Sequence, residues 1–177
     1  LTGSAVSGLT TTQVAALTPA QFNGVTATQI PSLTTDQLAA LPTSRIQTLN
    51  ANQIGALTIT QIAGLTTTQI PVLTTAEIGL LSRVQLRALT VTQTQSLTTT
   101  QIAALSVTQL PNMTGTQLAG LTATQFATLN GTQIGSLTTN QVQSLNTTEV
   151  SALTPNQITG FTASQVGGLT STQIDVL

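Results

Sequence analysis

The residues that could take part in acid–base chemistry are few and lie far apart in the sequence. The chain of 177 residues has no histidine and no cysteine, and its only charged residues are Asp36, Arg45, Glu77, Arg83, Arg87, Glu149 and Asp175. A nucleophilic serine or threonine needs a neighbouring base, and general acid–base catalysis needs a titratable pair. Because no two carboxylates are close in the sequence, we predict that the protein is not an enzyme.

The same composition argues against several classes of ligand. Zinc sites are built from cysteine and histidine, and calcium-binding repeats supply carboxylates in each repeat. A net charge of -1 leaves no basic face for phosphates or an anionic membrane surface. No apolar run reaches the roughly 18 residues that cross a bilayer. We expect no metal, no cofactor, no nucleic-acid partner and no membrane insertion.

An eight-residue repeat fills the chain, so the elements that it forms must position any functional residue. The segment 97–105, LTTTQIAAL, shows it, and the pattern returns 22 times from Leu1 without insertion or deletion, after which Leu177 opens another octad. We number the octad from its leucine: positions one and six are apolar, position two is Thr, Ser or Asn, position five is Gln, and position eight is small. Such regularity predicts one solenoid domain over 1–177.

A single long element cannot use this repeat. Eight residues turn a helix by about 800°, so the apolar stripe would drift by roughly 80° per octad. In a continuous strand, positions one and six would face opposite sides. The chain is therefore expected to turn within every octad.

Positions two and five form the pattern of a helix capping box. A Thr, Ser or Asn side chain at the N-cap accepts an N–H of the first turn, and a Gln or Glu three residues later accepts the N–H of the cap. Pro19 and Pro155 then fall at the first helical position, where proline is favoured. The expected N-caps include Thr10, Thr66, Thr98 and Asn130. Their expected partners include Gln13, Gln69, Glu77, Gln101 and Glu149.

The repeat also indicates where each helix ends. Glycine at position eight, as at Gly8, Gly24 and Gly168, suits a left-handed residue after the helix. Pro31, Pro71 and Pro111 stand at position seven and leave room for about one turn. The first octad, LTGSAVSG, lacks Gln and is expected to fray or to mark a boundary. In LPTSRIQT, at 41–48, both capping partners are replaced, and Thr43 or Ser44 is expected to cap instead.

The favoured fold class is all-α: a solenoid or superhelix of very short capped helices, one per octad. Its expected core includes Leu9, Leu65, Ile70, Leu97, Ile102, Leu105 and Phe161. The alternative is a β-solenoid, because Thr and Ile favour strands. The capping box favours helices, since a β-coil does not need Gln three residues after Thr. Helices this short are poor alone, so packing between octads must hold them.

A longer period of 40 residues lies above the octad over about 21–140. Pro31, Pro71 and Pro111 are 40 residues apart, and Asn50 and Asn130 are 80 apart. One interpretation is duplication of a five-octad block. The other is that five octads complete a whole number of superhelical turns, which would place the prolines on one face.

The LTxxQI octads resemble octapeptide-repeat tracts in long secreted or surface, adhesin-like proteins of Gram-negative bacteria. The resemblance covers the whole chain and implies an extracellular or cell-surface scaffold. An uncharged rod with apolar stacking surfaces at its ends is expected to associate with itself, end to end or side by side. The predicted function is therefore a filament, sheath or adhesin stalk. Ice binding by the Thr-rich face is the alternative, and contacts with a surface or carbohydrate stay open.

Overall fold

The structure, a computed structural model, describes residues 2–177, and every octad in them forms one helical segment. Nineteen α-helices and three 3-10 helices account for the 22 octads. Residues 2–177 contain no strand. The all-α prediction is therefore confirmed, and the β-solenoid alternative is wrong.

The chain groups into two compact units, Leu1–Leu89 and Thr90–Leu177. The first unit contains α1 Gly3–Ser7, α2 Thr11–Ala15, α3 Pro19–Asn23, η1 Ile30–Ser32, α4 Thr35–Ala39, α5 Thr43–Ile46, α6 Ala51–Ala56, α7 Ile59–Gly64, η2 Ile70–Val72, α8 Thr75–Leu80 and α9 Arg83–Ala88. The second unit contains α10 Val91–Ser96, α11 Thr99–Ala103, η3 Leu110–Asn112, α12 Gly115–Leu118, α13 Ala123–Phe126, α14 Gly131–Ser136, α15 Thr139–Gln143, α16 Thr147–Ser151, α17 Pro155–Ile158, α18 Ala163–Gly167 and α19 Ser171–Ile174.

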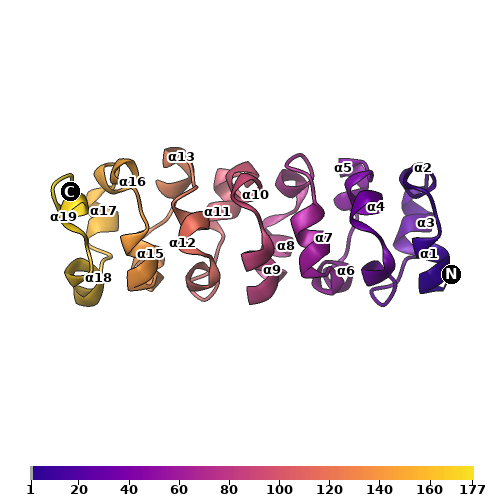
Figure 1. The fold of residues 1–177 in the computed structure, drawn as a ribbon, viewed down its shortest axis with the longest axis horizontal. Coiled ribbons are helices and arrows are strands. Elements are labelled where there is room, and N and C mark those ends of the chain that lie inside the picture. Colours follow the sequence, from indigo (N-terminus) through magenta and orange to yellow (C-terminus); the bar gives the residue numbers. More distant parts are fainter. Residues whose placement is uncertain (1) are drawn as a thin grey trace. The chain divides into compact units, whose positions relative to one another are not determined.

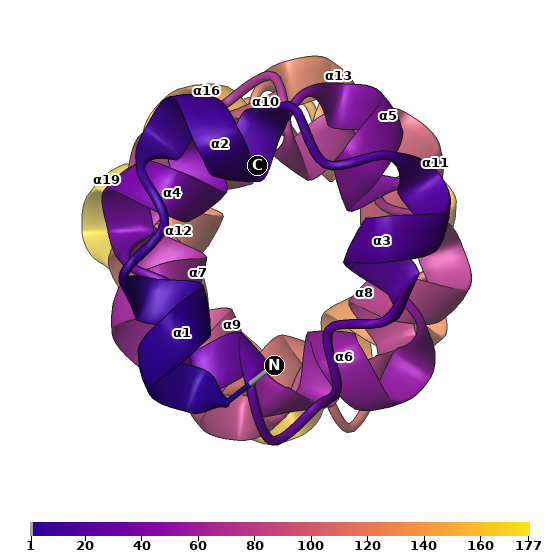
Figure 2. The same ribbon diagram turned by 90° about the vertical axis from the view of Figure 1, so that its right-hand side faces the viewer.

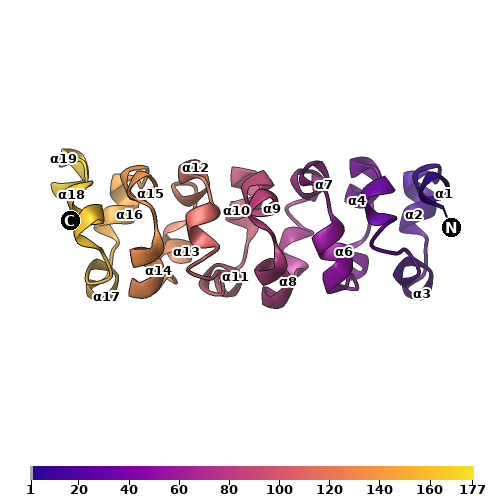
Figure 3. The same cartoon turned by 90° about the horizontal axis from the view of Figure 1, so that it is seen from below.

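Within each unit the helices follow one another around a ring. Figures 1 and 2 show this for α1 to α9, coloured indigo to magenta, and Figure 3 shows the second unit from another side. Each helix packs on the one three octads along the chain: α2 on α4 and α4 on α7 in the first unit, α11 on α13 and α14 on α17 in the second. The side chain of Gln61 reaches carbonyls 28 and 31 residues earlier. One turn therefore takes between three and four octads.

This turn size decides between the two interpretations of the 40-residue period. In the first unit, Pro31 and Pro71 are five octads apart, which is more than one turn and less than two. The idea that five octads complete a whole number of turns is therefore wrong, and block duplication is the interpretation that remains. Locally, each proline replaces the α-helix of its octad by a 3-10 helix, η1, η2 or η3.

Every α-helix except α1 and α5 begins with a reciprocal capping box. In α2, the Gln13 N–H donates to Thr10 Oγ1 at 3.2 Å, and the Thr10 N–H donates to Gln13 Oε1 at 2.8 Å. The first octad does not fray as expected, because α1 is capped by Thr2, whose Oγ1 accepts from the Ala5 N–H. The N-cap of α5 is Pro42, and no side chain caps this helix, so the expected caps Thr43 and Ser44 were wrong.

The helices do not end in left-handed residues, and that prediction was wrong. Gly8, Gly24 and Gly168 have φ of -78°, -74° and -93°, and no residue within 2–177 has a positive φ. Instead, position one leaves the helix in an extended conformation. Leu57, for example, has φ -60° and ψ 128°, and its N–H donates to the Ile54 carbonyl.

At Gly64, Gly160 and Gly168, which stand at position eight, another turn passes close to the backbone. A Cβ on Gly64 would lie 3.0 Å from the Cβ of Thr35, which occupies position three, 29 residues earlier. A Cβ on Gly168 would collide with Thr139, which is also 29 residues earlier, and one on Gly160 would collide with the backbone of Gly131. Glycine at this position thus serves close packing between turns.

The core of each unit consists of the apolar side chains at positions one and six. Ile54 and Ile134 at position six are fully buried, and the leucines at position one in the inner turns are almost as inaccessible. Thr94, which replaces the apolar residue at position six, is also fully buried and donates its hydroxyl to the Thr90 carbonyl at 3.0 Å. The apolar side chains at positions one and six therefore pack the octads of each unit against one another.

Candidate functional site

The structure does not gather the charged side chains into a reactive cluster. Within residues 2–177, no three or more His, Cys, Asp or Glu residues lie where they could hold a metal ion. No helix in the same range is long and apolar enough to cross a membrane. Arg83 and Arg87 both lie exposed on α9.

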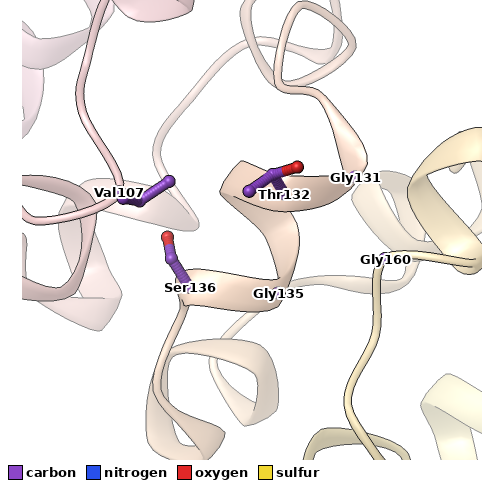
Figure 4. A pocket seen from close by; sticks show the side chains of 6 residues that line it. All are labelled: Val107, Gly131, Thr132, Gly135, Ser136 and Gly160. Carbon is purple, nitrogen blue, oxygen red and sulfur yellow. The ribbon is translucent and has the colours of Figure 1, made fainter.

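A shallow, open depression lies in the second unit. Its volume is about 470 Å³, and its walls are Val107, Gly131, Thr132, Gly135, Ser136 and Gly160 (Figure 4). Three of these residues are glycines without side chains, and none is charged. The depression therefore offers no acid, base or metal ligand.

The feature that recurs at every turn is the side-chain amide of the glutamine at position five. Gln61 is 3% exposed, and its Oε1 accepts the N–H of its own N-cap, Thr58, at 2.9 Å. Its Nε2 donates to the carbonyls of Ile30 and Leu33, both at 2.7 Å. One amide thus caps its own helix and ties that helix to the preceding turn.

Other glutamines form the same pair of contacts, and we call the set the glutamine clamps. In each, Nε2 reaches carbonyls 28 to 31 residues earlier. In the first unit they include Gln37, Gln53, Gln61, Gln69 and Gln85. In the second unit they include Gln125, Gln133, Gln141, Gln157, Gln165 and Gln173.

The double role explains why position five is glutamine rather than glutamate. A capping box accepts either residue, because it uses only an acceptor oxygen. The carbonyls of the preceding turn also accept, so the second contact needs a donor, and only the amide offers both. The clamp is buried, where an unsatisfied polar group costs about 1–3 kcal/mol.

The two positions at which a charged residue leaves a buried atom unsatisfied are both position five. Within residues 2–177, the buried side-chain atoms without a hydrogen-bond partner are Arg45 Nε and Glu149 Oε1. Burial raises the pKa of the Glu149 carboxyl from its ordinary 4.5 to about 7, against the lowering effect of the hydrogen bond from the Asn146 N–H. Glu77 also accepts its cap N–H, from Thr74 at 2.6 Å.

The other predicted residues are N-caps, their capping partners and core side chains. Thr10, Thr98 and Asn130 are N-caps with reciprocal bonds to Gln13, Gln101 and Gln133. Thr66 and Gln69 form the same pair ahead of the 3-10 helix η2. The predicted core residues Leu65, Ile70, Leu97, Ile102 and Leu105 are buried. Leu9 and Phe161 are only partly buried, because they lie in turns that are packed on one side.

The first and last turns expose complementary groups. Gln13 and Gln21 are exposed, and their side-chain Oε1 atoms accept the N–H groups of their own N-caps, Thr10 and Thr18. In the last turn of the second unit, the position-six residues Ile158, Val166 and Ile174 are 38%, 52% and 57% exposed, whereas their counterparts in inner turns are buried. The first turn of the first unit thus offers amide donors, and the last turn of the second unit offers exposed apolar side chains.

Comparison with known proteins supports the repeat character of the chain. Residues 30–67 match the model of the ALTTAQ repeat family. No curated protein matches the chain. The match covers about a fifth of the chain and gives no support to a link with adhesins in particular. Residues 30–67 are thus similar to an ALTTAQ repeat, and the chain as a whole is a tandem-repeat protein of short helices.

Proposed function

We propose that the protein is an extracellular structural protein, without enzymatic activity, whose copies join head to tail into a filament, sheath or stalk. The observation that carries this proposal is the complementarity of the first and last turns. In the inner turns, amide donors on one side meet carbonyls and apolar side chains on the other. Within residues 2–177, the first and last turns expose these same groups.

The octad count gives the register of such a joint. If it continues from one copy to the next, Gln13 of one copy stands 28 and 31 positions after Phe161 and Ile158 of a second copy. Those are the spacings of the glutamine clamps, as in Gln61 with Leu33 and Ile30. The amide of Gln13 would then donate to these two carbonyls.

The same register covers the exposed apolar side chains. Gln21 of one copy would face the carbonyls of Val166 and Leu169 of the second, and its turn would bury Val166. Burial of one such side chain contributes about 1.5–3 kcal/mol. Because the net charge is only -1, electrostatic repulsion between copies is weak. The extracellular location rests on the resemblance to octapeptide tracts of surface proteins.

A pair of matched substitutions tests the joint. We expect negative-stain images and sedimentation of the unmodified protein to show particles that lengthen as concentration rises. Val166→Glu puts a charge in the joint and is expected to leave short particles. Val84→Glu, also at an exposed site but in α9 of the first unit, is the control and is expected to change nothing. Monodisperse unmodified protein at high concentration, or equal effects of both variants, would contradict the proposal.

Ice binding is the second candidate, and the exposed hydroxyl pairs favour it. Thr98 and Thr100 share a hydrogen bond of 2.9 Å, and Thr114 and Thr116 share another. Ice-binding surfaces need such groups on one flat face, whereas successive octads in each unit follow a ring. Thermal hysteresis at micromolar protein would favour this candidate over the scaffold.

A further inference from the structure

The joint between α13 and α16 in the second unit has a carboxyl group where the glutamine clamps have an amide. At position five of α16 stands Glu149, which is 2% exposed. Its Oε2 accepts the N–H of Asn146 at 2.8 Å, so the cap is intact. Its Oε1 is buried without a partner, at the place where a glutamine has its Nε2.

The register shows what Oε1 faces. The glutamine one octad earlier, Gln141, donates to the carbonyls of Met113 and Leu110, 28 and 31 residues before it. The same spacings from Glu149 lead to Leu121 and Leu118. A buried carboxylate oxygen that faces acceptors has no attractive partner, whereas a carboxylic acid can donate one hydrogen bond to them.

We propose that Glu149 is a pH-operated latch between two turns of the second unit. With the carboxyl protonated, its O–H donates to a carbonyl of the preceding turn and the joint is closed. Loss of the proton at higher pH removes this donor and leaves a buried charge against carbonyl oxygens, which loosens the joint. The proposal is independent of the head-to-tail assembly.

The helices that pack on α16 carry no charged side chain that would shift the pKa of Glu149. α16 packs on α13 and α19, and neither Ala123–Phe126 nor Ser171–Ile174 includes a charged residue. Asp175, which follows α19 and is exposed, is the only other ionisable side chain in Thr90–Leu177. The neighbouring Asn146 supplies part of the missing donation, because its Nδ2 reaches the Ala119 carbonyl at 3.4 Å.

The sign of the pH effect follows from burial. The pKa of Glu149 is raised from 4.5 to about 7, so between these pH values the folded unit holds a proton that the unfolded chain has lost. The contribution of Glu149 to the stability of the folded unit is therefore fully present below pH 4.5 and is lost as the pH rises to about 7. Each unit of pKa shift is a factor of ten, so the folding equilibrium constant falls on the order of a hundredfold.

Glu149→Gln is the direct test, because it restores the amide donor and keeps the cap. We expect the urea midpoint of the unmodified protein to drop from pH 5 to pH 8, and the midpoint of Glu149→Gln to stay nearly level and to exceed it at pH 8. Hydrogen exchange should place the loss of protection of the unmodified protein in residues 118–128 and 146–152. An equal pH dependence in both proteins, or a loss of protection elsewhere, would overturn the proposal.

Two further measurements sharpen the test. Gln141→Glu puts a carboxyl into the neighbouring clamp and is expected to create a second pH-dependent joint. At pH 8, added Na⁺ or Ca²⁺ should not restore the protection of residues 118–128. Restoration by either ion would mean that the oxygen atoms hold a cation rather than a proton, and would also overturn the latch.

Discussion

A single residue type, the glutamine at position five, links the local and the long-range structure of this protein. Its carbonyl oxygen completes a capping box, and its amide N–H group donates to carbonyls about one turn earlier. The first role could be predicted from Thr-x-x-Gln alone. The second could not, because an octad does not reveal which octads lie beside it. The signal was present, however: 18 of 22 octads have Gln and only two have Glu, although a capping box accepts both.

Substitution of glutamine by glutamate separates the two roles. Gln61→Glu keeps an acceptor for the Thr58 N–H but loses the donor to Ile30 and Leu33. We expect it to lower the free energy of unfolding by about 2–4 kcal/mol at pH 8, because a buried charge is left against two carbonyls. Urea denaturation followed by circular dichroism measures the change.

Gln13→Glu is the control for this substitution. Gln13 has the same capping bonds as Gln61, but its side chain is exposed and lies in the first turn of the first unit. Its replacement is expected to change stability by less than about 0.5 kcal/mol. Equal losses in the two variants would show that the cap, and not the clamp, carries the energy.

At the scale of the helix, the beginnings were easier to predict than the ends. N-caps, Pro19 and Pro155 follow from side-chain chemistry within four residues, and the structure has them where the pattern puts them. The expectation of left-handed glycines failed because glycine at position eight answers a different need, the close passage of position three of another turn. That contact is 29 residues away in the sequence, so the octad itself gives no sign of it.

Two glycines of the second unit test this explanation. Gly160→Ala adds a Cβ that collides with the backbone of Gly131, and backbone atoms cannot move aside cheaply. We expect a loss of about 1–3 kcal/mol in the free energy of unfolding. Gly167→Ala, at the end of α18 with nothing within 4 Å of the added Cβ, is expected to stabilise by up to about 1 kcal/mol. If Gly160→Ala is the more stable of the two in thermal denaturation, close packing does not explain position eight.

At the scale of the whole molecule, the repeat predicted a solenoid but not its turn. The number of octads per turn is the sum of small rotations in the extended residues at positions one and two, and no residue type encodes that sum. The contacts 24, 28 and 31 residues apart show that a turn takes between three and four octads. This spacing also sets which groups the first and last turns expose, and thus the proposed joint between copies.

The register of that joint can be measured with cysteines, since the chain has none of its own. If the 29-residue contact between positions eight and three continues across copies, Ala16 of one copy faces Ala163 of the next. We expect the variant Ala16→Cys/Ala163→Cys to give, on mild oxidation, a ladder of reducible oligomers in non-reducing gels. The control Ala16→Cys/Thr148→Cys, with the second cysteine at an exposed site of α16, a helix that already packs on α19, should give little or none. The absence of a ladder, or ladders of equal strength from both variants, would contradict the head-to-tail account.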